Sequence, residues 1–284
     1  MSLGAILTAI VTPMAPDGSL DEEGFVRLMS YCASNGSDGF VVCGTTGEAP
    51  TLTTDEHLRI IELAVAERPE GTTVVAGTGS NDTAHAVAMT ARAAELGADA
   101  VLSVTPYYNR PNRRGVRAHY EAIAAASDLP IVLYNIPART GLDLPNDQLA
   151  ELAEIPTVRY VKQANPDNLA PVDGLGVYAG NDDMLADVLD MGGEGGILVA
   201  SHLAGPQMRR MVDSTEDRAQ IDAKLRPFFD ALGVTTNPIP IKAALEMAGL
   251  PAGPLRLPLV SASEDERAVI SAAMEAAGIA VGGR

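Results

Sequence analysis

Residues 73–104, TVVAGTGSNDTAHAVAMTARAAELGADAVLSV, place a helical stretch between two short apolar runs. We expect strands at Thr73 to Gly77 and Ala100 to Val104, and a helix at Thr83 to Leu96 between them. Gly, Asn and Asp residues separate the three segments, as is typical of turns. Because both runs are continuously apolar, they favour strands that are buried on both faces of a parallel sheet.

The same alternation continues on both sides of this unit. About eight strand–helix units in roughly 200 residues predict a TIM (β/α)8 barrel, with a doubly wound open sheet as the alternative. The other expected strands are Ala5 to Val11, Gly39 to Cys43, Ile131 to Tyr134, Val158 to Val161, Val177 to Gly180 and Gly196 to Val199. The other expected helices are Glu22 to Ser34, Asp55 to Glu67, Val116 to Ala126, Asn146 to Ala153 and Asp183 to Met191.

After Gly205 the sequence shows no further strand pattern, and the remaining residues predict helices separated by Pro and Gly. These helices are expected at Arg209 to Leu232, Ile239 to Met247 and Glu264 to Ala277. We therefore predict a catalytic barrel over residues 1–224 and a C-terminal helical domain over residues 225–284.

The length, hydrophobic content and net charge of the chain limit the kinds of protein it can be and the partners it can bind. The chain has 284 residues, of which 46% are hydrophobic, and a formal net charge of −17. An ample core is available, while nucleic acid and anionic membrane surfaces are disfavoured as partners. The apolar start, Met1 to Pro13, lacks the basic residues of a signal peptide and is read as a strand, and no apolar run is long enough to span a membrane. Two cysteines, Cys32 and Cys43, fit buried thiols in a reducing compartment, so we expect a cytoplasmic protein.

In a barrel of this kind, the chemistry lies at the carboxyl ends of the strands. Reactive side chains follow four of the expected strands. They occur in Gly44 to Glu48 (GTTGE), Thr105 to Pro111 (TPYYNRP) and Tyr134 to Thr140 (YNIPART), and at Lys162.

Lys162 is one of only three lysines, against seventeen arginines. A lysine buried in an apolar strand has a lowered pKa, and its neutral amine can form a Schiff base. The alternative is a solvent-exposed lysine just beyond the strand. Lys242 competes for the same role, but it lies in a helical segment outside the barrel, where packing or an interface explains it.

Tyrosine and threonine hydroxyls at the strand ends suit proton transfer. Tyr134 and Tyr108 are the candidate tyrosines, with Thr45 and Thr46 as hydroxyl partners. An aromatic packing surface at a subunit contact explains the Tyr107–Tyr108 pair equally well. Arg139 suits a bidentate grip on a carboxylate, and the alternative is a solvated loop arginine.

Cofactor and metal signals are weak. Gly77-Thr-Gly79 lacks the third glycine of a dinucleotide fingerprint, and the four histidines are dispersed. Asp182 and Asp183 are explained by a helix N-cap. We therefore expect neither an organic cofactor nor a metal.

The ordered motifs resemble the dihydrodipicolinate synthase and N-acetylneuraminate lyase family of Schiff-base aldolases. The resemblance covers nearly the whole chain. Besides the strand-end motifs, it includes AGNDD at Ala179 to Asp183, GGxGxI at Gly192 to Ile197, NPIPIKAAL at Asn237 to Leu245 and LRLPL at Leu255 to Leu259.

This resemblance implies specific roles. Lys162 would form the imine with pyruvate, Tyr134 would move protons, and Thr45 and Tyr108 would complete a hydroxyl relay, with Tyr108 reaching into a neighbouring subunit. Thr46 would contact the pyruvate carboxylate, and the backbones of Gly180 and Ile197 would line the pocket.

Arg139 in YNIPxRTG resembles members that act on aspartate semialdehyde. The implied reaction condenses pyruvate with L-aspartate 4-semialdehyde to 4-hydroxy-tetrahydrodipicolinate, for lysine and diaminopimelate synthesis. The alternatives are a pyruvate-dependent aldolase acting on a sugar acid and a catalytically silent paralogue that binds small acids. The family implies a homotetramer built as a dimer of dimers. Departures at Ala49, Pro50, Thr54 and His85 predict weak or absent inhibition by lysine.

Overall fold

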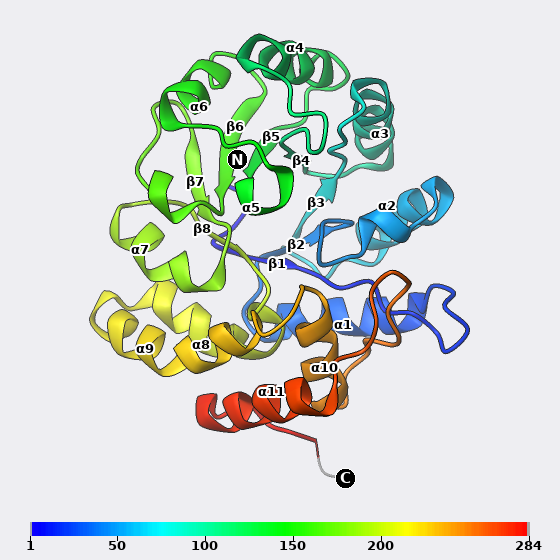
Figure 1. Ribbon diagram of the computed structural model, residues 1–284, viewed down its shortest axis with the longest axis vertical. Helices are drawn as coiled ribbons and strands as arrows, with labels where there is room; N and C mark the ends of the chain where they lie inside the picture. The colour runs from blue at the N-terminus through cyan, green and yellow to red at the C-terminus, as the bar shows by residue number, and fades with distance from the viewer. Residues whose placement is uncertain (1, 283–284) are drawn as a thin grey trace.

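The computed structural model describes residues 2–282 and shows eight parallel strands closed into a barrel (Figure 1). Each strand pairs with the next along the chain, and β8 pairs with β1. This closure confirms the expected barrel and excludes the open sheet. The strands are β1 Ile6–Ala9, β2 Gly39–Val42, β3 Thr73–Gly77, β4 Ala100–Val104, β5 Ile131–Asn135, β6 Val158–Gln163, β7 Gly176–Ala179 and β8 Gly195–Leu198.

Helices surround the barrel, and several begin at side chains that cap them. Thr53 and Glu56 form a capping box at the start of α2, and Asn112 caps α4. The helices that follow the strands are α1 Glu22–Ser34, α2 Thr54–Glu67, α3 Thr83–Leu96, α4 Arg113–Ala124, α5 Pro137–Thr140, α6 Asn146–Leu152, α7 Leu185–Asp190 and α8 Ser201–Asp213. Three short 3-10 helices are η1 Ala49–Thr51, η2 Pro166–Asn168 and η3 Asp182–Met184.

The C-terminal helices α9 Thr215–Ala231, α10 Ile239–Met247 and α11 Glu264–Ala277 gather on one side of the barrel (Figure 1). The expected single helix Arg209 to Leu232 is wrong. Ser214 separates α8 from α9 with an extended backbone, and its side chain accepts a hydrogen bond from the backbone N–H of Asp217. Residue 225 lies inside α9, so the predicted domain boundary falls within a helix; the division itself stays a prediction.

Two apolar layers follow from the alternation of side chains along the strands. The larger layer lies between the strands and the helices. The smaller one fills the barrel interior and includes Leu7, Val41, Val75, Val132 and Ile197. The barrel interior is therefore filled mainly by apolar side chains.

Both cysteines are free and buried, as expected for structural thiols. Burial raises the pKa of Cys32 to about 12 and raises that of Cys43 further. Over residues 2–282, none of the helices is long and apolar enough to cross a membrane. Within the same range, no group of three or more His, Cys, Asp or Glu residues has an arrangement suited to holding a metal ion.

Candidate active site

A cavity of about 390 Å³ opens at the carboxyl ends of the strands. Its walls come from residues in or just after β1, β2, β4, β5, β6, β7 and β8, together with the end of α9 and the loop that follows it. The polar lining residues are Thr45, Thr46, Tyr134, Arg139, Lys162, Asn181, Asp182, Asp183, Asp230 and Asn237. The cavity therefore brings one buried lysine together with hydroxyl groups, an arginine and carboxylates.

Lys162 lies within β6, because this strand continues two residues beyond the expected end at Val161. The side chain is 5% exposed, which excludes the solvent-exposed alternative. Its ammonium nitrogen lies 4.3 Å from the ring centroid of Tyr134, the residue opposite it on β5. Burial lowers the pKa of Lys162 to about 8, and nearby Arg139 lowers it too, while Asp182 opposes the shift. A substantial fraction of this amine is neutral, and thus nucleophilic, near neutral pH.

Tyr134 is 6% exposed and faces the same cavity. Burial raises the pKa of its phenol to about 12, whereas Arg139 and a hydrogen bond with Thr45 lower it. The phenol is therefore protonated at neutral pH and hydrogen-bonded to a second hydroxyl. This arrangement suits a proton donor that a neighbouring hydroxyl can resupply.

Thr46 is buried, and its hydroxyl oxygen accepts a 3.0 Å hydrogen bond from Nδ2 of Asn237. The carbonyl of Asn237 also accepts a 3.4 Å hydrogen bond from Nη2 of Arg139. Arg139 is exposed at the cavity wall. Asn237 thus connects Thr46 and Arg139, the two residues that we expect to bind substrate carboxylates.

Gly180 lines the cavity where two strand ends approach closely. A Cβ atom there would lie 2.7 Å from both the Ala164 side chain and the Gln163 carbonyl oxygen. Only glycine therefore fits at this position without displacing the backbone of β6.

Asp182 has a different role from the expected N-cap. Its side chain does not cap η3, which follows Asn181; instead Oδ1 accepts 2.9 Å hydrogen bonds from the backbone N–H groups of Val199 and Ala200. Burial raises the pKa of this carboxyl to about 6, and these hydrogen bonds and Lys162 lower it. The carboxylate is therefore tied to the start of α8 and faces the cavity of Lys162.

Six of the eight nominated residues line the cavity: Thr45, Thr46, Tyr134, Arg139, Lys162 and Gly180. Ile197, whose backbone was expected to line the pocket, is not among the lining residues, and its side chain is fully buried in the barrel interior. Tyr108 lies outside as well. It is 91% exposed and has a φ of 68°, an unusual backbone conformation for a tyrosine.

Residues that follow the barrel in the sequence form part of the cavity wall, which the sequence patterns do not predict. Phe229, Leu232 and Asn237 line the cavity although they follow the barrel in sequence. The signal for Asn237 was its place in NPIPIK, directly before an apolar helix. The sequence alone predicts a packing or interface role for Lys242 of this motif, because the segment lies outside the barrel, and it predicts no role for Asn237.

Comparison with known proteins agrees with this geometry. Residues 2–277 match the model of the dihydrodipicolinate synthetase family. The 4-hydroxy-tetrahydrodipicolinate synthase of Moorella thermoacetica is 45% identical, with 98% of this chain and 100% of that protein covered.

Two solved structures share the fold closely. The chloride-inhibited dihydrodipicolinate synthase from Acinetobacter baumannii, complexed with pyruvate, is 36% identical with a TM-score of 0.94, covering 98% of this chain and 100% of that one. A protein described as the first monomeric dihydrodipicolinate synthase variant is 37% identical with a TM-score of 0.94, covering 98% of each chain. On the family match, the relative and the fold together, the chain belongs to the dihydrodipicolinate synthetase family.

Proposed function

We propose that this protein condenses pyruvate with L-aspartate 4-semialdehyde to give 4-hydroxy-tetrahydrodipicolinate, with Lys162 as the Schiff-base residue. The observation that carries the assignment is the buried Lys162 amine, whose pKa is lowered to about 8 and which lines the same cavity as Thr45, Thr46, Tyr134 and Arg139. The activity of the relatives and the pyruvate in the Acinetobacter structure support the same assignment.

The first step forms the imine. The neutral amine of Lys162 attacks the keto carbon of pyruvate, and the carbinolamine loses its oxygen as water. The departing hydroxyl needs a proton, which the phenol of Tyr134 is placed to give because it stays protonated at neutral pH. Thr45, hydrogen-bonded to that phenol, resupplies the proton. The protonated imine then loses a methyl proton to the Tyr134–Thr45 pair, which has just given one up, and becomes an enamine.

The second step joins the two carbon chains. The enamine carbon attacks the aldehyde of aspartate semialdehyde, forming a C–C bond, and the aldehyde oxygen takes up a proton from the Tyr134–Thr45 pair as it becomes a hydroxyl. The amino group of the bound intermediate then attacks the imine carbon. Cyclisation breaks the bond to Lys162 and returns the free amine, so the overall reaction releases one water.

Arg139 and Thr46 hold the substrate carboxylates in this scheme. The chain carries a net charge of −17, which repels anionic substrates at long range. The guanidinium of Arg139 at the cavity wall therefore attracts the substrate carboxylates, whereas the acidic surface around it repels them.

Tyr108 acts in this scheme through a second copy of the chain. An aromatic side chain that is 91% exposed on a left-handed backbone is suited to insertion into a partner. We propose a homotetramer in which Tyr108 completes the hydroxyl relay of a neighbouring subunit. Light scattering on the purified protein tests the assembly, and a monomer with full activity contradicts it. We also propose a cytoplasmic location.

Reduction with borohydride in the presence of pyruvate tests the imine. We expect a mass increase that peptide mapping places on Lys162, and a protein without that adduct contradicts the mechanism. A coupled assay with aspartate semialdehyde and with sugar-acid aldehydes separates the synthase from an aldolase. Turnover only with a sugar aldehyde refutes the synthase assignment, and no turnover with any aldehyde indicates a silent paralogue.

A further inference from the structure

A buried ion pair joins the loop after β2 to helix α10. Nζ of Lys242 lies 2.5 Å from Oε1 of Glu48, and both side chains are almost fully buried, at 3% and 1% exposure. Neither residue lines the cavity. Burial of an ion pair costs desolvation energy and is by itself weak evidence for a role in stability.

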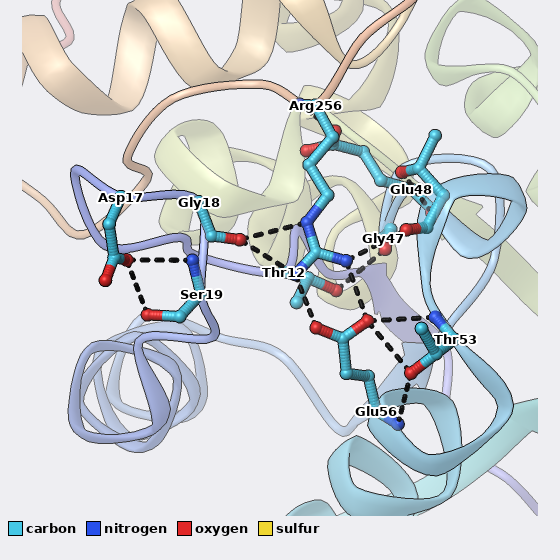
Figure 2. A network of polar contacts seen from close by, with 10 residues as sticks. Thr12, Asp17, Gly18, Ser19, Gly47, Glu48, Thr53, Glu56 and Arg256 are labelled. Carbon is cyan, nitrogen blue, oxygen red and sulfur yellow. Dashed lines mark hydrogen bonds and ion pairs between the residues drawn. The ribbon is translucent and has the colours of Figure 1, made fainter.

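Each partner makes a second contact with the segment after α10. Lys242 donates a 2.9 Å hydrogen bond to the carbonyl of Pro254, and Oε2 of Glu48 accepts one of 3.0 Å from the backbone N–H of Arg256. The Arg256 guanidinium then donates to the carboxylate of Glu56 and to the carbonyl of Gly18 (Figure 2). The ion pair therefore belongs to a network that fixes the C-terminal segment against the start of the chain.

The loop that carries Glu48 is held in a single shape. Glu48 has a φ of 55°, a left-handed conformation that is unfavourable for a residue with a Cβ. The Gly47 carbonyl accepts a 2.7 Å hydrogen bond from Thr12 (Figure 2), and the N–H of Glu48 donates to the carbonyl of Thr45. These contacts hold the backbone of Glu48 beside Thr45 and Thr46, the two residues of this loop that line the cavity.

Lys242, the other residue of the ion pair, is also linked to the cavity, through Asn237. Asn237 lies five residues before Lys242 and directly precedes Pro238, the N-cap of α10, whose carbonyl accepts a hydrogen bond from the N–H of Lys242. Asn237 donates to the hydroxyl oxygen of Thr46 and accepts from Arg139. Each residue of the ion pair is therefore close in sequence to one partner of the Asn237–Thr46 hydrogen bond: Glu48 follows Thr46, and Lys242 follows Asn237.

We propose that the Glu48–Lys242 ion pair is a positioning device for substrate binding, which aligns Thr46 and, through Asn237, Arg139 with the carboxylate of pyruvate. This inference rests on the proposed function. Lys162 and Tyr134 come from β6 and β5, and Tyr134 meets this loop through its hydrogen bond with Thr45, so loss of the pair changes pyruvate affinity more than the rate of imine chemistry at saturation.

The experiment compares Lys242→Met with a matched control, Arg218→Met. Arg218 is also a buried cation with one carboxylate partner, Asp190, and one backbone carbonyl partner, that of Met211. It does not line the cavity. Borohydride trapping of the pyruvate adduct measures the half-saturating pyruvate concentration and the rate at saturation, and thermal unfolding measures stability.

We expect Lys242→Met to raise the half-saturating pyruvate concentration by about tenfold or more, which corresponds to ~1.4 kcal/mol, with the saturating rate changed less than about threefold. Arg218→Met should lower the melting temperature without this change. Lys242→Arg, which keeps the cation, should restore part of the affinity.

Two further variants test the inference even if Lys242→Met fails to fold. The double variant Glu48→Gln with Lys242→Met leaves no unpaired buried charge, and Asn237→Ala removes the bridge without touching the pair. Both should raise the half-saturating concentration in a folded protein. If the wild type forms an adduct but Lys242→Met, the double variant and Asn237→Ala all keep its pyruvate affinity, the ion pair has only a structural role and this inference is overturned. If the wild type forms no adduct, the proposed function fails and the inference fails with it.

Discussion

The pH dependence of imine formation should shift in opposite directions when the two charges around Lys162 are removed. Asp182 raises the pKa of Lys162 and Arg139 lowers it, against a large lowering by burial. Asp182→Asn keeps a side-chain oxygen for the N–H groups of Val199 and Ala200 while it removes the negative charge. Arg139→Met removes the positive charge.

The magnitude follows from the position of the Lys162 pKa. At a pKa of about 8, roughly one amine in ten is neutral at pH 7, compared with about one in 3,000 at the ordinary value of 10.5. A unit charge on the order of 10 Å away contributes ~1.7 kcal/mol at an effective dielectric constant of about 20, which is about one pH unit. In Asp182→Asn, roughly half of the amines should then be neutral at pH 7. The shift in Arg139→Met should be smaller, because solvent screens the exposed guanidinium.

The assay is the initial rate of pyruvate adduct formation at limiting pyruvate, measured by intact mass after reduction, between pH 6 and pH 10. The position of the acid limb reports the pKa of the free enzyme, whereas the plateau also contains effects on pyruvate binding. We expect the midpoint to move down by about one pH unit in Asp182→Asn and up in Arg139→Met. Midpoints that coincide in all three proteins, or that move in the reverse order, refute the electrostatic account of Lys162.

Three other outcomes are expected. Tyr134→Phe should lower the rate of imine formation by roughly 10²- to 10⁴-fold because it removes the proton donor, with the melting temperature nearly unchanged; stopped-flow trapping measures this, and a rate near wild type excludes Tyr134 as the donor. Glu56→Gln should destabilise the protein at pH 7 by roughly 1–2 kcal/mol, because hydrogen bonds from Arg256 lower the pKa of Glu56 from 4.5 to about 2. This contribution is present above pH 4.5 and is lost as the pH falls towards 2, so urea unfolding of the two proteins should converge there, and a difference that persists at pH 2 contradicts it. Lysine should inhibit weakly or not at all, because the family resemblance places His85 at a position where lysine-inhibited members often carry a polar or acidic group; a submillimolar inhibition constant in the coupled assay contradicts this.

The barrel was predictable because its signals are local. Continuous apolar runs such as Thr73 to Gly77, separated from helical stretches by turn residues, depend only on neighbouring sequence, and the structure reproduces this strand at the expected bounds. The break between α8 and α9 is local too, but the polar run around Ser214 also fits the exposed face of one long helix. Its hydrogen bond to the N–H of Asp217 decides the matter, and only the structure shows it.

The candidate site was predictable where chemistry and strand position coincide. Lys162 could be selected because lysine is scarce and follows apolar strand residues. The N-cap interpretation of Asp182 is wrong because its hydrogen-bond partners, Val199 and Ala200, lie 17 and 18 residues away in the sequence. Asn237 and the Glu48–Lys242 pair were missed for the same reason, since they join segments nearly two hundred residues apart. The physical information that assigns them is tertiary contact, which strand and helix periodicity does not contain.

The contact between Glu48 and Lys242 also has a consequence for the order in which the protein matures. Glu48 belongs to the second strand–helix unit to leave the ribosome, and its counter-charge lies near the end of the chain. Until that last part is synthesised, the carboxylate must remain hydrated, because burial of an unpaired charge is costly. The Thr45–Thr46 loop therefore reaches its final shape only when almost all of the chain has been made. The barrel strands around Lys162 come from earlier parts of the chain, whereas the pyruvate-binding surface also needs Asn237, which follows them.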